Sequence, residues 1–443
     1  MLLAIEKLVY GGDGLARLPA DNKDRAKTVF LPFVLGGEKV EAILTEQKSS
    51  FARGKVESVI EPSPYRVAAG CPYFGSCGGC HYQYASYEHQ LQIKEAILRE
   101  NLRRIAKIEL EVPIQIHAGE PWHYRNRSRL QVRTSPAFLT GYFRHGSHEM
   151  MSVEACPISS PLINHAISAV WRSGRAGKVP EGVREIEFFA NADDSQLLAE
   201  IYCSTEIRRA ALRAWAEEFQ ADFPPVAGMV LFCAGNNGRD LPEKFLSIGD
   251  ESLNYVVPGT TYRVSAGAFF QVNRFLVDDL IKTVTLEQKG DTALDLYAGV
   301  GLFSKALACD FKHIFSVESS QPAASDLSYN LPSNAAVTQA TADQFLGGSA
   351  KSRRSGTGTF IPPLLHAPDL AVVDPPRSGL GENVARLLAK CGAPRIIYVS
   401  CDPATLARDL GVLLAEGYAI EQAHLFDLFP QTFHLETVLH LVR

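Results

Sequence analysis

The 443-residue sequence has no long apolar segment. No apolar run approaches the roughly 18 residues that a membrane-spanning helix needs. The first residues, MLLAIEKLVY, have a short apolar core interrupted by Glu6, which is atypical of a secretion signal. We therefore expect a cytoplasmic protein without membrane contact. In a reducing compartment its nine cysteines are not expected to form a disulfide framework.

The sequence also lacks an excess of positive charge. Its formal net charge of −5 argues against an indiscriminate polyanion binder. Residues 94–145 nevertheless contain ten Lys or Arg and five Asp or Glu, a net of +5, so the remaining residues sum to −10. A local basic segment on an acidic protein is typical of steering toward one polyanionic partner. For residues 94–107 alone, a solvated helix face is the better interpretation.

The pattern of strands and turns changes twice along the chain, and the length suggests about three domains. Residues 1–62 combine short apolar runs with glycine-rich turns, which predicts a small β-barrel. Residues 63–255 contain a cysteine cluster, a helical pattern and several short strands. From 256 to 443 strands alternate with helices, which predicts an α/β domain with a mostly parallel sheet. Within it, residues 347–363 are rich in Gly, Ser and basic residues and are interpreted as a mobile insertion.

The stretch LDLYAGVGLFSKALA, residues 294–308, has the pattern of a strand, a glycine turn and a helix. Gly299 and Gly301 permit the close backbone approach that a nucleotide-like ligand needs. Glu318 ends the next predicted strand, where a carboxylate can bind both ribose hydroxyls. Ser304 stands where an NAD-binding motif has its third glycine. The pattern therefore favours S-adenosylmethionine over NAD or a merely structural turn.

Two further predicted strand ends carry rigid or reactive residues. In AVVDPPRSGL, residues 371–380, an acid precedes two prolines that fix the backbone and can hold a planar base, although Asp-Pro also begins ordinary turns. In IIYVSCDPATLARDL, residues 396–410, Cys401 lies at a strand end just before a helix. A free cysteine is more often a buried hydrophobe. The helix N-terminus, however, predicts a lowered thiol pKa and hence a nucleophile.

A group of cysteines around CPYFGSCGGC, residues 71–80, is unsuited to a protein core. Three cysteines within ten residues, together with a later Cys-Pro pair, fit a structural zinc or an iron–sulfur cluster. The distant Cys-Pro favours [4Fe–4S]. The predicted ligands are Cys71, Cys77, Cys80 and Cys156, with Cys203 or Cys233 as alternative fourth ligands.

The segment WHYRNRSRLQVR, residues 122–133, interleaves four arginines with two aromatic residues. If it is a strand, the even spacing places Arg125, Arg127, Arg129 and Arg133 on one face. A face of guanidinium groups suits phosphate contacts and base stacking. A solvated sheet face is an equally good interpretation.

The motifs DLYAGVG, DPPR and SCDPATLARDL, in this order, resemble those of the bacterial RNA uracil-5-methyltransferases. GAFFQVN (267–273) and HLETV (434–438) match further signatures, and the resemblance covers nearly the whole chain. It implies a TRAM-like OB barrel that binds RNA over 1–62 and an iron–sulfur, RNA-binding domain over 63–255. A Rossmann-like class I methyltransferase domain is implied over 256–443. The cysteine cluster is typical of the 23S rRNA-modifying branch, in which it holds a [4Fe–4S] cluster.

The resemblance implies transfer of a methyl group from S-adenosylmethionine to C5 of a uridine in 23S rRNA. Cys401 would add to C6 of an extruded uracil, and Glu436 would remove the C5 proton. Two residues depart from the family pattern: Asp402 replaces a frequent Asn and could raise the thiol pKa, and Leu302 replaces an Asn that contacts the cofactor. The residues implied to bind the cofactor are Gln271, Tyr297, Glu318, Asp343 and Asp374.

Two alternative functions fit the same motifs less well. The same chemistry on the tRNA T-loop is the nearest, but that branch typically lacks the cysteine cluster and the barrel. A non-catalytic iron–sulfur protein that binds RNA would need neither Cys401 nor Glu436. RNA is thus the expected partner, and no obligatory protein partner is indicated.

Overall fold

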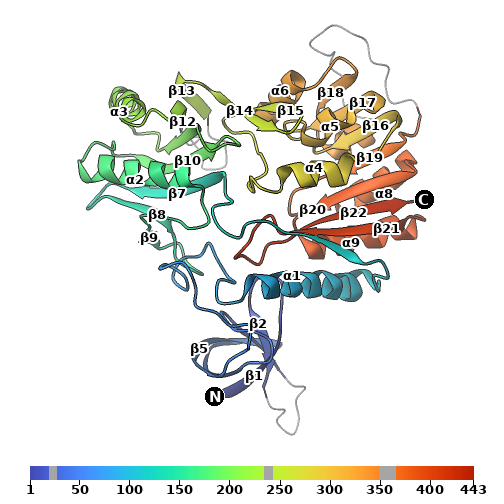
Figure 1. Ribbon diagram of the computed structural model, residues 1–443, viewed down its shortest axis with the longest axis horizontal. Coiled ribbons are helices and arrows are strands. Elements are labelled where there is room, and N and C mark those ends of the chain that lie inside the picture. The colour runs from blue at the N-terminus through green and yellow to red at the C-terminus, as the bar shows by residue number, and fades with distance from the viewer. Residues whose placement is uncertain (19–26, 234–242, 349–365) are drawn as a thin grey trace.

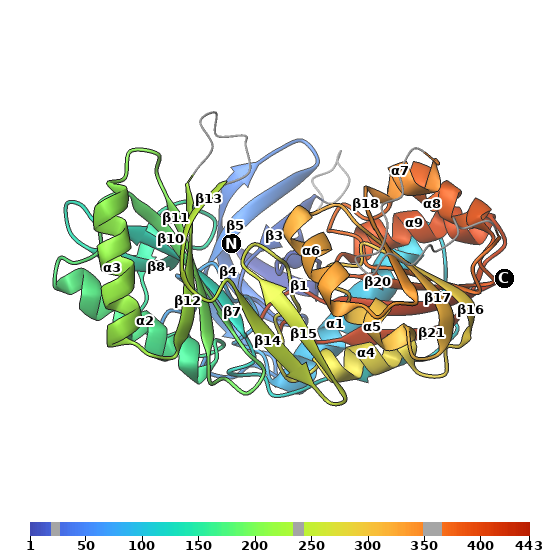
Figure 2. The same cartoon turned by 90° about the horizontal axis from the view of Figure 1, so that it is seen from above.

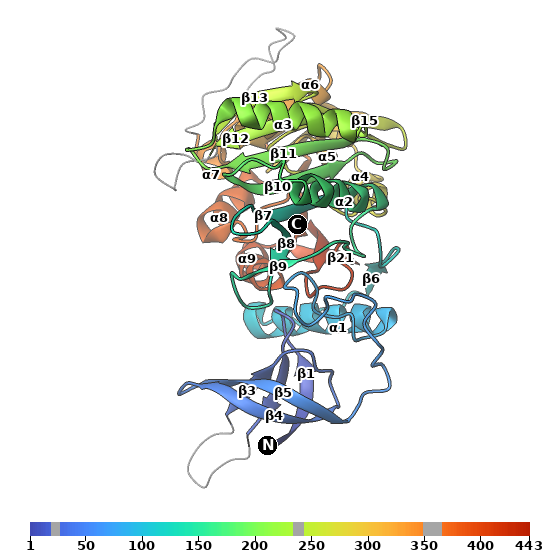
Figure 3. The ribbon, with the colours of Figure 1, turned by 90° about the vertical axis from the view of Figure 1, so that its left-hand side faces the viewer.

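The computed structural model describes residues 1–18, 27–233, 243–348 and 366–443, and it is shown in Figure 1. The predicted insertion at 347–363 therefore lies almost entirely outside the described residues. No helix of the described part is long and apolar enough to cross a membrane. Figures 1 and 3 show a small barrel on one side of helix α1 (Tyr87–Asn101) and two larger sheets on its other side.

The N-terminal strands close into a five-stranded barrel, in the order β1-β2-β3-β5-β4. Alternate side chains point inward, so that Leu3, Ile5 and Val29 are buried in the barrel core. The small β-barrel predicted from the sequence is therefore present. Its strands are β1 (Leu2–Leu8), β2 (Gly14–Arg17), β3 (Thr28–Leu31), β4 (Lys39–Gln47) and β5 (Phe51–Glu61).

The middle of the chain forms a seven-stranded sheet in the order β13-β12-β11-β10-β7-β8-β9. Helices α2 (Pro161–Arg175) and α3 (Arg209–Asp222) pack on one face, where the apolar residues of this sheet gather. Figure 2 shows that the other face turns toward the rest of the molecule. The strands are β7 (Arg127–Arg133), β8 (Leu139–Phe143), β9 (Met150–Ser152), β10 (Val183–Ala190), β11 (Leu197–Cys203), β12 (Val226–Cys233) and β13 (Glu243–Gly249).

The C-terminal half forms an eight-stranded sheet in the order β18-β17-β16-β19-β20-β22-β21-β6. The neighbouring strands β18, β17, β16, β19 and β20 are parallel, as predicted. Strand β22 is antiparallel to both of its neighbours, β20 and β21. The edge strand β6 comes from far upstream and pairs in parallel with β21. The strands are β6 (Ile114–His117), β16 (Gly290–Leu296), β17 (Phe311–Glu318), β18 (Ala335–Gln339), β19 (Leu370–Val373), β20 (Arg395–Ser400), β21 (Ala419–Phe426) and β22 (Glu436–Val442).

Helices cover both faces of this sheet and bury one apolar core on each side. The hairpin β14 (Ser252–Val257) and β15 (Thr260–Ser265) lies between the two large sheets (Figure 2). This architecture is that of a class I methyltransferase fold preceded by a small barrel. The helices are α4 (Val277–Thr285), α5 (Leu302–Leu307), α6 (Gln321–Asn330), α7 (Ala342–Leu346), α8 (Gly381–Cys391) and α9 (Pro403–Ala415).

Helix α1 is fastened to the C-terminal sheet by a buried ion pair. Lys94 donates hydrogen bonds to the carboxylate of Asp427 and to the carbonyl of Phe429, and the side chains of Lys94 and Asp427 are fully buried. Burial lowers the pKa of Lys94, and the charge of Asp427 opposes this effect. The expectation of a solvated helix face over 94–107 is therefore wrong for Lys94, which lies inside the molecule.

Candidate active site

Five of the predicted site residues lie at the carboxyl edge of the parallel strands. This is the edge at which open α/β sheets bind their ligands. The residues are Tyr297 after β16, Glu318 at the end of β17, Asp343 on α7 after β18, Asp374 after β19 and Cys401 after β20. The fold thus brings together residues that are spread over more than a hundred positions of the sequence.

The turn after β16 has the backbone conformation that the glycine motif predicts. Tyr297, Gly299 and Gly301 have positive φ angles of 63°, 55° and 95°. For Tyr297, this left-handed conformation costs on the order of 1 kcal/mol, a strain that is often concentrated at ligand sites. The carboxylate of Glu318 accepts hydrogen bonds from the N–H groups of Gly299 at 2.9 Å and Ser320 at 2.6 Å. The turn and the acidic strand end therefore form one unit.

Three carboxyl groups with raised pKa values lie at this end of the sheet: Asp295 near the end of β16, Asp374 after β19 and Glu436 at the start of β22. Burial raises the pKa of Asp295 to about 7, and desolvation together with the charge of Asp295 raises the pKa of half-buried Asp374 to about 7. Burial and the charge of Asp374 also raise the pKa of Glu436 well above its usual range. Among the described residues, one oxygen of Asp295 and one of Glu436 have no hydrogen-bond partner. Buried acceptors of this kind suit a positively charged ligand.

Cys401 lies at the bend between β20 and α9, and its side chain is partly buried. Burial raises the pKa of the thiol to about 12. The charges of Glu436 and Asp374 add to this effect, and the guanidinium of Arg377 opposes it. The predicted lowering of the thiol pKa by the helix N-terminus is therefore wrong.

Asp402 contributes to this difference, because it occupies the helix N-terminus itself. Its carboxylate accepts hydrogen bonds from the N–H groups of Ala404 at 3.0 Å and Thr405 at 2.9 Å. The positive end of the helix is thus compensated by an acid next to the thiol, and the charge of Asp402 contributes to raising the pKa of Cys401. An increase of the thiol pKa is the direction expected where Asp402 replaces the Asn that is frequent in the family.

The DPPR segment contributes a residue whose importance the sequence reasoning missed. The guanidinium of Arg377 lies 3.3 Å from a ring nitrogen of His434, and its charge acts to lower the pKa of both Cys401 and Glu436.

Asp409 on α9 is fully buried and fixes the loop that follows the DPPR segment. Its carboxylate accepts hydrogen bonds from the Leu380 N–H at 2.7 Å and the Tyr398 hydroxyl at 2.8 Å.

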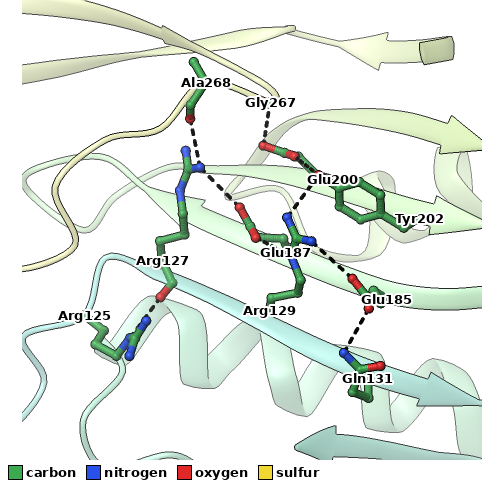
Figure 4. A network of polar contacts seen from close by, with 10 residues as sticks. All are labelled: Arg125, Arg127, Arg129, Gln131, Glu185, Glu187, Glu200, Tyr202, Gly267 and Ala268. Atoms are coloured by element: carbon green, nitrogen blue, oxygen red, sulfur yellow. Dashed lines mark hydrogen bonds and ion pairs between the residues drawn. The ribbon is translucent and has the colours of Figure 1, made fainter. Parts of the chain in front are cut away.

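The predicted arginine face serves mainly to bind another part of the chain. Arg127 and Arg129 form ion pairs with Glu187 at 3.2 and 2.6 Å, as Figure 4 shows. Arg127 also donates a hydrogen bond to the carbonyl of Ala268 at 2.9 Å, and Glu200 accepts one from the Gly267 N–H at 2.9 Å. The interpretation of these two arginines as a free phosphate-binding face is therefore wrong.

This network holds the beginning of the segment that carries Gln271, the remaining predicted cofactor ligand. Gln271 is buried, and its carbonyl accepts a hydrogen bond from the amide of Asn126 at 3.0 Å. The middle sheet thus fixes the position of a segment that belongs, by sequence, to the C-terminal half. The alternation of Arg and Glu on neighbouring strands is the signal that could have indicated compensated charges.

The four predicted metal ligands line one cavity of about 250 Å³. Burial raises the pKa of Cys71, Cys77 and Cys80, the last to about 12, and a negative charge on Cys156 raises each of them further. The thiols are therefore close enough to influence one another. Among the described residues, however, no group of three or more His, Cys, Asp or Glu side chains is arranged to hold a metal ion. The alternative ligands Cys203 and Cys233 do not line this cavity.

Comparison with known proteins places the chain among RNA-modifying enzymes. The sequence model of the family described as tRNA (Uracil-5-)-methyltransferase matches residues 86–443. An uncharacterized RNA methyltransferase of Aquifex aeolicus is 33% identical over 98% of this chain and 97% of its own length. The 23S rRNA (uracil(1939)-C(5))-methyltransferase RlmD of Alkalilimnicola ehrlichii is 30% identical over 98% of this chain and 95% of its own.

The fold agrees with these sequence matches. The crystal structure of Pyrococcus abyssi tRNA (uracil-54, C5)-methyltransferase, in complex with S-adenosyl-L-homocysteine, superposes with a TM-score of 0.74. It covers 100% of both chains at 21% sequence identity, which shows a common fold. The chain therefore belongs to the tRNA (uracil-5-)-methyltransferase family, whose members methylate C5 of uracil in RNA.

Proposed function

We propose that this protein methylates C5 of a uridine in 23S rRNA, with S-adenosylmethionine as the methyl donor. The observation that carries the chemistry is the grouping of Cys401, Asp374 and Glu436, whose charges influence one another at the edge of the sheet. The rRNA substrate is supported by the RlmD relatives of Alkalilimnicola ehrlichii and Vibrio parahaemolyticus, both 30% identical over 98% of this chain. The second candidate substrate is the tRNA T-loop, which the family description and the Pyrococcus abyssi structure favour.

The residues at the sheet edge fit S-adenosylmethionine. Glu318, at the end of β17, would accept hydrogen bonds from the ribose hydroxyls. Acidic groups with raised pKa values fit a sulfonium cation because an opposite charge stabilises their ionised forms. In the described part of the chain, Asp295 and Glu436 also each have one carboxyl oxygen without a hydrogen-bond partner. The proposed cofactor-binding residues are Gln271, Tyr297, Glu318, Asp343 and Asp374.

The proposed reaction uses Cys401 as a nucleophile and Glu436 as a base. The thiolate forms a bond to C6 of the uracil, and the electrons of the C5–C6 double bond move toward the C4 carbonyl oxygen. S-adenosylmethionine supplies the methyl group that the resulting nucleophilic C5 accepts. Deprotonated Glu436 then removes the C5 proton, the C5–C6 double bond re-forms, and the thiolate leaves. The uridine must be extruded from its RNA to reach this site.

Reactivity of the thiol is expected to depend on pH and on cofactor charge. With a pKa of about 12, the thiolate fraction of Cys401 rises about tenfold per pH unit through the neutral and mildly alkaline range. The rate at which iodoacetamide alkylates Cys401, measured by peptide mass spectrometry, should rise with this thiolate fraction. Sinefungin, in which a charged amine replaces the sulfonium, should shift this profile to lower pH. Neutral S-adenosylhomocysteine is the control for steric blocking, and a rate independent of pH from 7 to 9 would contradict the raised pKa.

We also propose a main role for each of the three sequence units. Residues 1–62 would form a TRAM-like barrel that binds RNA, 63–255 an iron–sulfur and RNA-binding unit, and 256–443 the catalytic unit. The four thiols around one cavity support a [4Fe–4S] cluster that stabilises the middle unit and shapes its RNA face. The proposed ligands are Cys71, Cys77, Cys80 and Cys156.

Protein purified without oxygen should be brown and should contain about four iron atoms and four sulfides per chain. Cys156→Ser should lower the iron content and the thermal stability. Cys309→Ser is the matched control, because Cys309 is exposed and does not line the cavity. A colourless protein that contains zinc would overturn the iron assignment.

The substrate is tested by mapping 5-methyluridine in rRNA and tRNA by mass spectrometry, in a deletion strain and its parent. Loss of the modification from a 23S fragment, restored by the wild-type gene but not by one encoding Cys401→Ala, is the expected result. Loss only from the tRNA T-loop would keep the chemistry and replace the substrate. No loss from either RNA would overturn the proposed function.

A further inference from the structure

The turn between β1 and β2 of the barrel reaches the bend that carries Cys401. The hydroxyl of Tyr10, in this turn, donates a hydrogen bond to the carbonyl oxygen of Cys401 at 3.1 Å. The two residues are 391 positions apart, and both are partly buried. A residue of the barrel therefore forms part of the wall of the candidate active site.

The turn is built so that it presents Tyr10 in a fixed direction. Its ends are joined by a backbone hydrogen bond of 3.1 Å from the Gly12 N–H to the Val9 carbonyl. Gly11 and Gly12 have φ angles of 108° and 96°, which glycine adopts most readily. A Cβ atom at Gly12 would lie only 3.2 Å from the side chain of His81, so the turn packs closely against the body of the protein.

Tyr10 also contacts the segment that leads to Glu436. Its ring packs edge-on against Phe433, with ring centroids 5.3 Å apart, and Phe433 lies 4.1 Å from the ring of His434. His434 is in turn next to Arg377, whose charge acts on both proposed catalytic groups. Tyr10 is therefore in contact with the bend that carries the nucleophile and with the segment that precedes the base.

We infer that Tyr10 is a positioning residue that aims the side chain of Cys401 and so makes the barrel a part of the reaction site. The Cys401 carbonyl belongs to the peptide between Cys401 and Asp402, and holding it fixes the backbone torsion that directs the thiol. A less restrained thiol spends less time in the geometry of attack on C6. This inference rests on the proposed role of Cys401 as nucleophile.

The test is the variant Tyr10→Phe, which removes the hydroxyl and keeps the aromatic contact with Phe433. Transcripts of 23S rRNA and of tRNA that contain 5-fluorouridine are used to trap the Cys401 adduct, because fluorine at C5 cannot leave as a proton. With the transcript that wild-type protein traps, adduct formation by the variant should be about tenfold slower. On the corresponding uridine RNA, kcat should fall to a similar extent, while KM and the RNA dissociation constant stay within about twofold.

Tyr84→Phe is the matched control. The Tyr84 hydroxyl also donates to a backbone carbonyl, that of Val34 at 2.9 Å, and this carbonyl does not belong to the bend that carries Cys401. Removal of the Tyr84 hydroxyl should change the melting temperature without slowing formation of the Cys401 adduct. Equal adduct rates for wild type and Tyr10→Phe would overturn the inference alone. Equal slowing in both variants would show a general effect on folding and would also overturn it. If wild-type protein traps neither transcript, the proposed function falls together with the inference.

Discussion

Cys401→Ala is expected to abolish methylation, with a loss of at least about 10⁴-fold in kcat, because the bond to C6 requires the Cys401 thiolate. The variant should also form no adduct with RNA that contains 5-fluorouridine. Methyl transfer is measured as incorporation of labelled methyl groups, and the adduct as a shifted band on a denaturing gel. The small change in side-chain volume should leave the RNA dissociation constant unaltered.

Cys391→Ala is the control for this result. Cys391 lies on α8 of the same unit, is partly buried, and has a thiol pKa that burial also raises. Its replacement should leave methylation and trapping within about twofold of wild type. Residual methylation by Cys401→Ala at a tenth of the wild-type rate would contradict a covalent mechanism. Such a result would favour direct transfer of the methyl group to a C5 atom that no thiolate has activated.

Glu436→Gln is expected to have the opposite effect on the adduct. Glutamine keeps the size of the side chain and cannot accept the C5 proton, so kcat should fall by about 10²- to 10⁴-fold. Because bond formation to C6 and methyl transfer precede the step that is blocked, a methylated covalent complex with ordinary uridine RNA should accumulate. Intact-protein mass spectrometry after ribonuclease digestion detects this complex.

The exposed residue Glu421, on the neighbouring strand β21, provides the control for the second variant. Glu421→Gln should turn over normally and accumulate no complex. If Glu436→Gln were inactive without any adduct, Glu436 would act before bond formation to C6, for example in binding the base. A different group would then have to remove the C5 proton.

Local pattern was enough to predict the parts of the site that each strand carries. The glycine turn, the acidic end of β17 and the bend at Cys401 all depend on residues within a single strand–turn–helix unit, so a short stretch of sequence specifies them. The small barrel and the parallel sheet followed from the same kind of periodicity.

Features that depend on distant contacts could not be predicted. The thiol pKa of Cys401 is raised first by burial and then by the charges of Glu436 and Asp374, which come from other strands. From the sequence alone, Arg127 can be interpreted as a phosphate ligand. Its ion pair with Glu187 is evident only when the adjacent strand is placed beside it. The approach of Tyr10 to Cys401 requires the position of the barrel relative to the sheet, and no motif encodes it.

The edge strand β6 has a consequence for the order in which the protein is made. Its pairing with β21 includes a contact between His117 and His424, which are 307 positions apart. During translation the β6 segment leaves the ribosome long before its partner and must remain unpaired until almost the whole chain has been synthesised. Non-local pairing of this kind slows folding and exposes a strand edge in the meantime. The nascent chain therefore keeps an unpaired strand segment, which favours aggregation, until its last strands emerge.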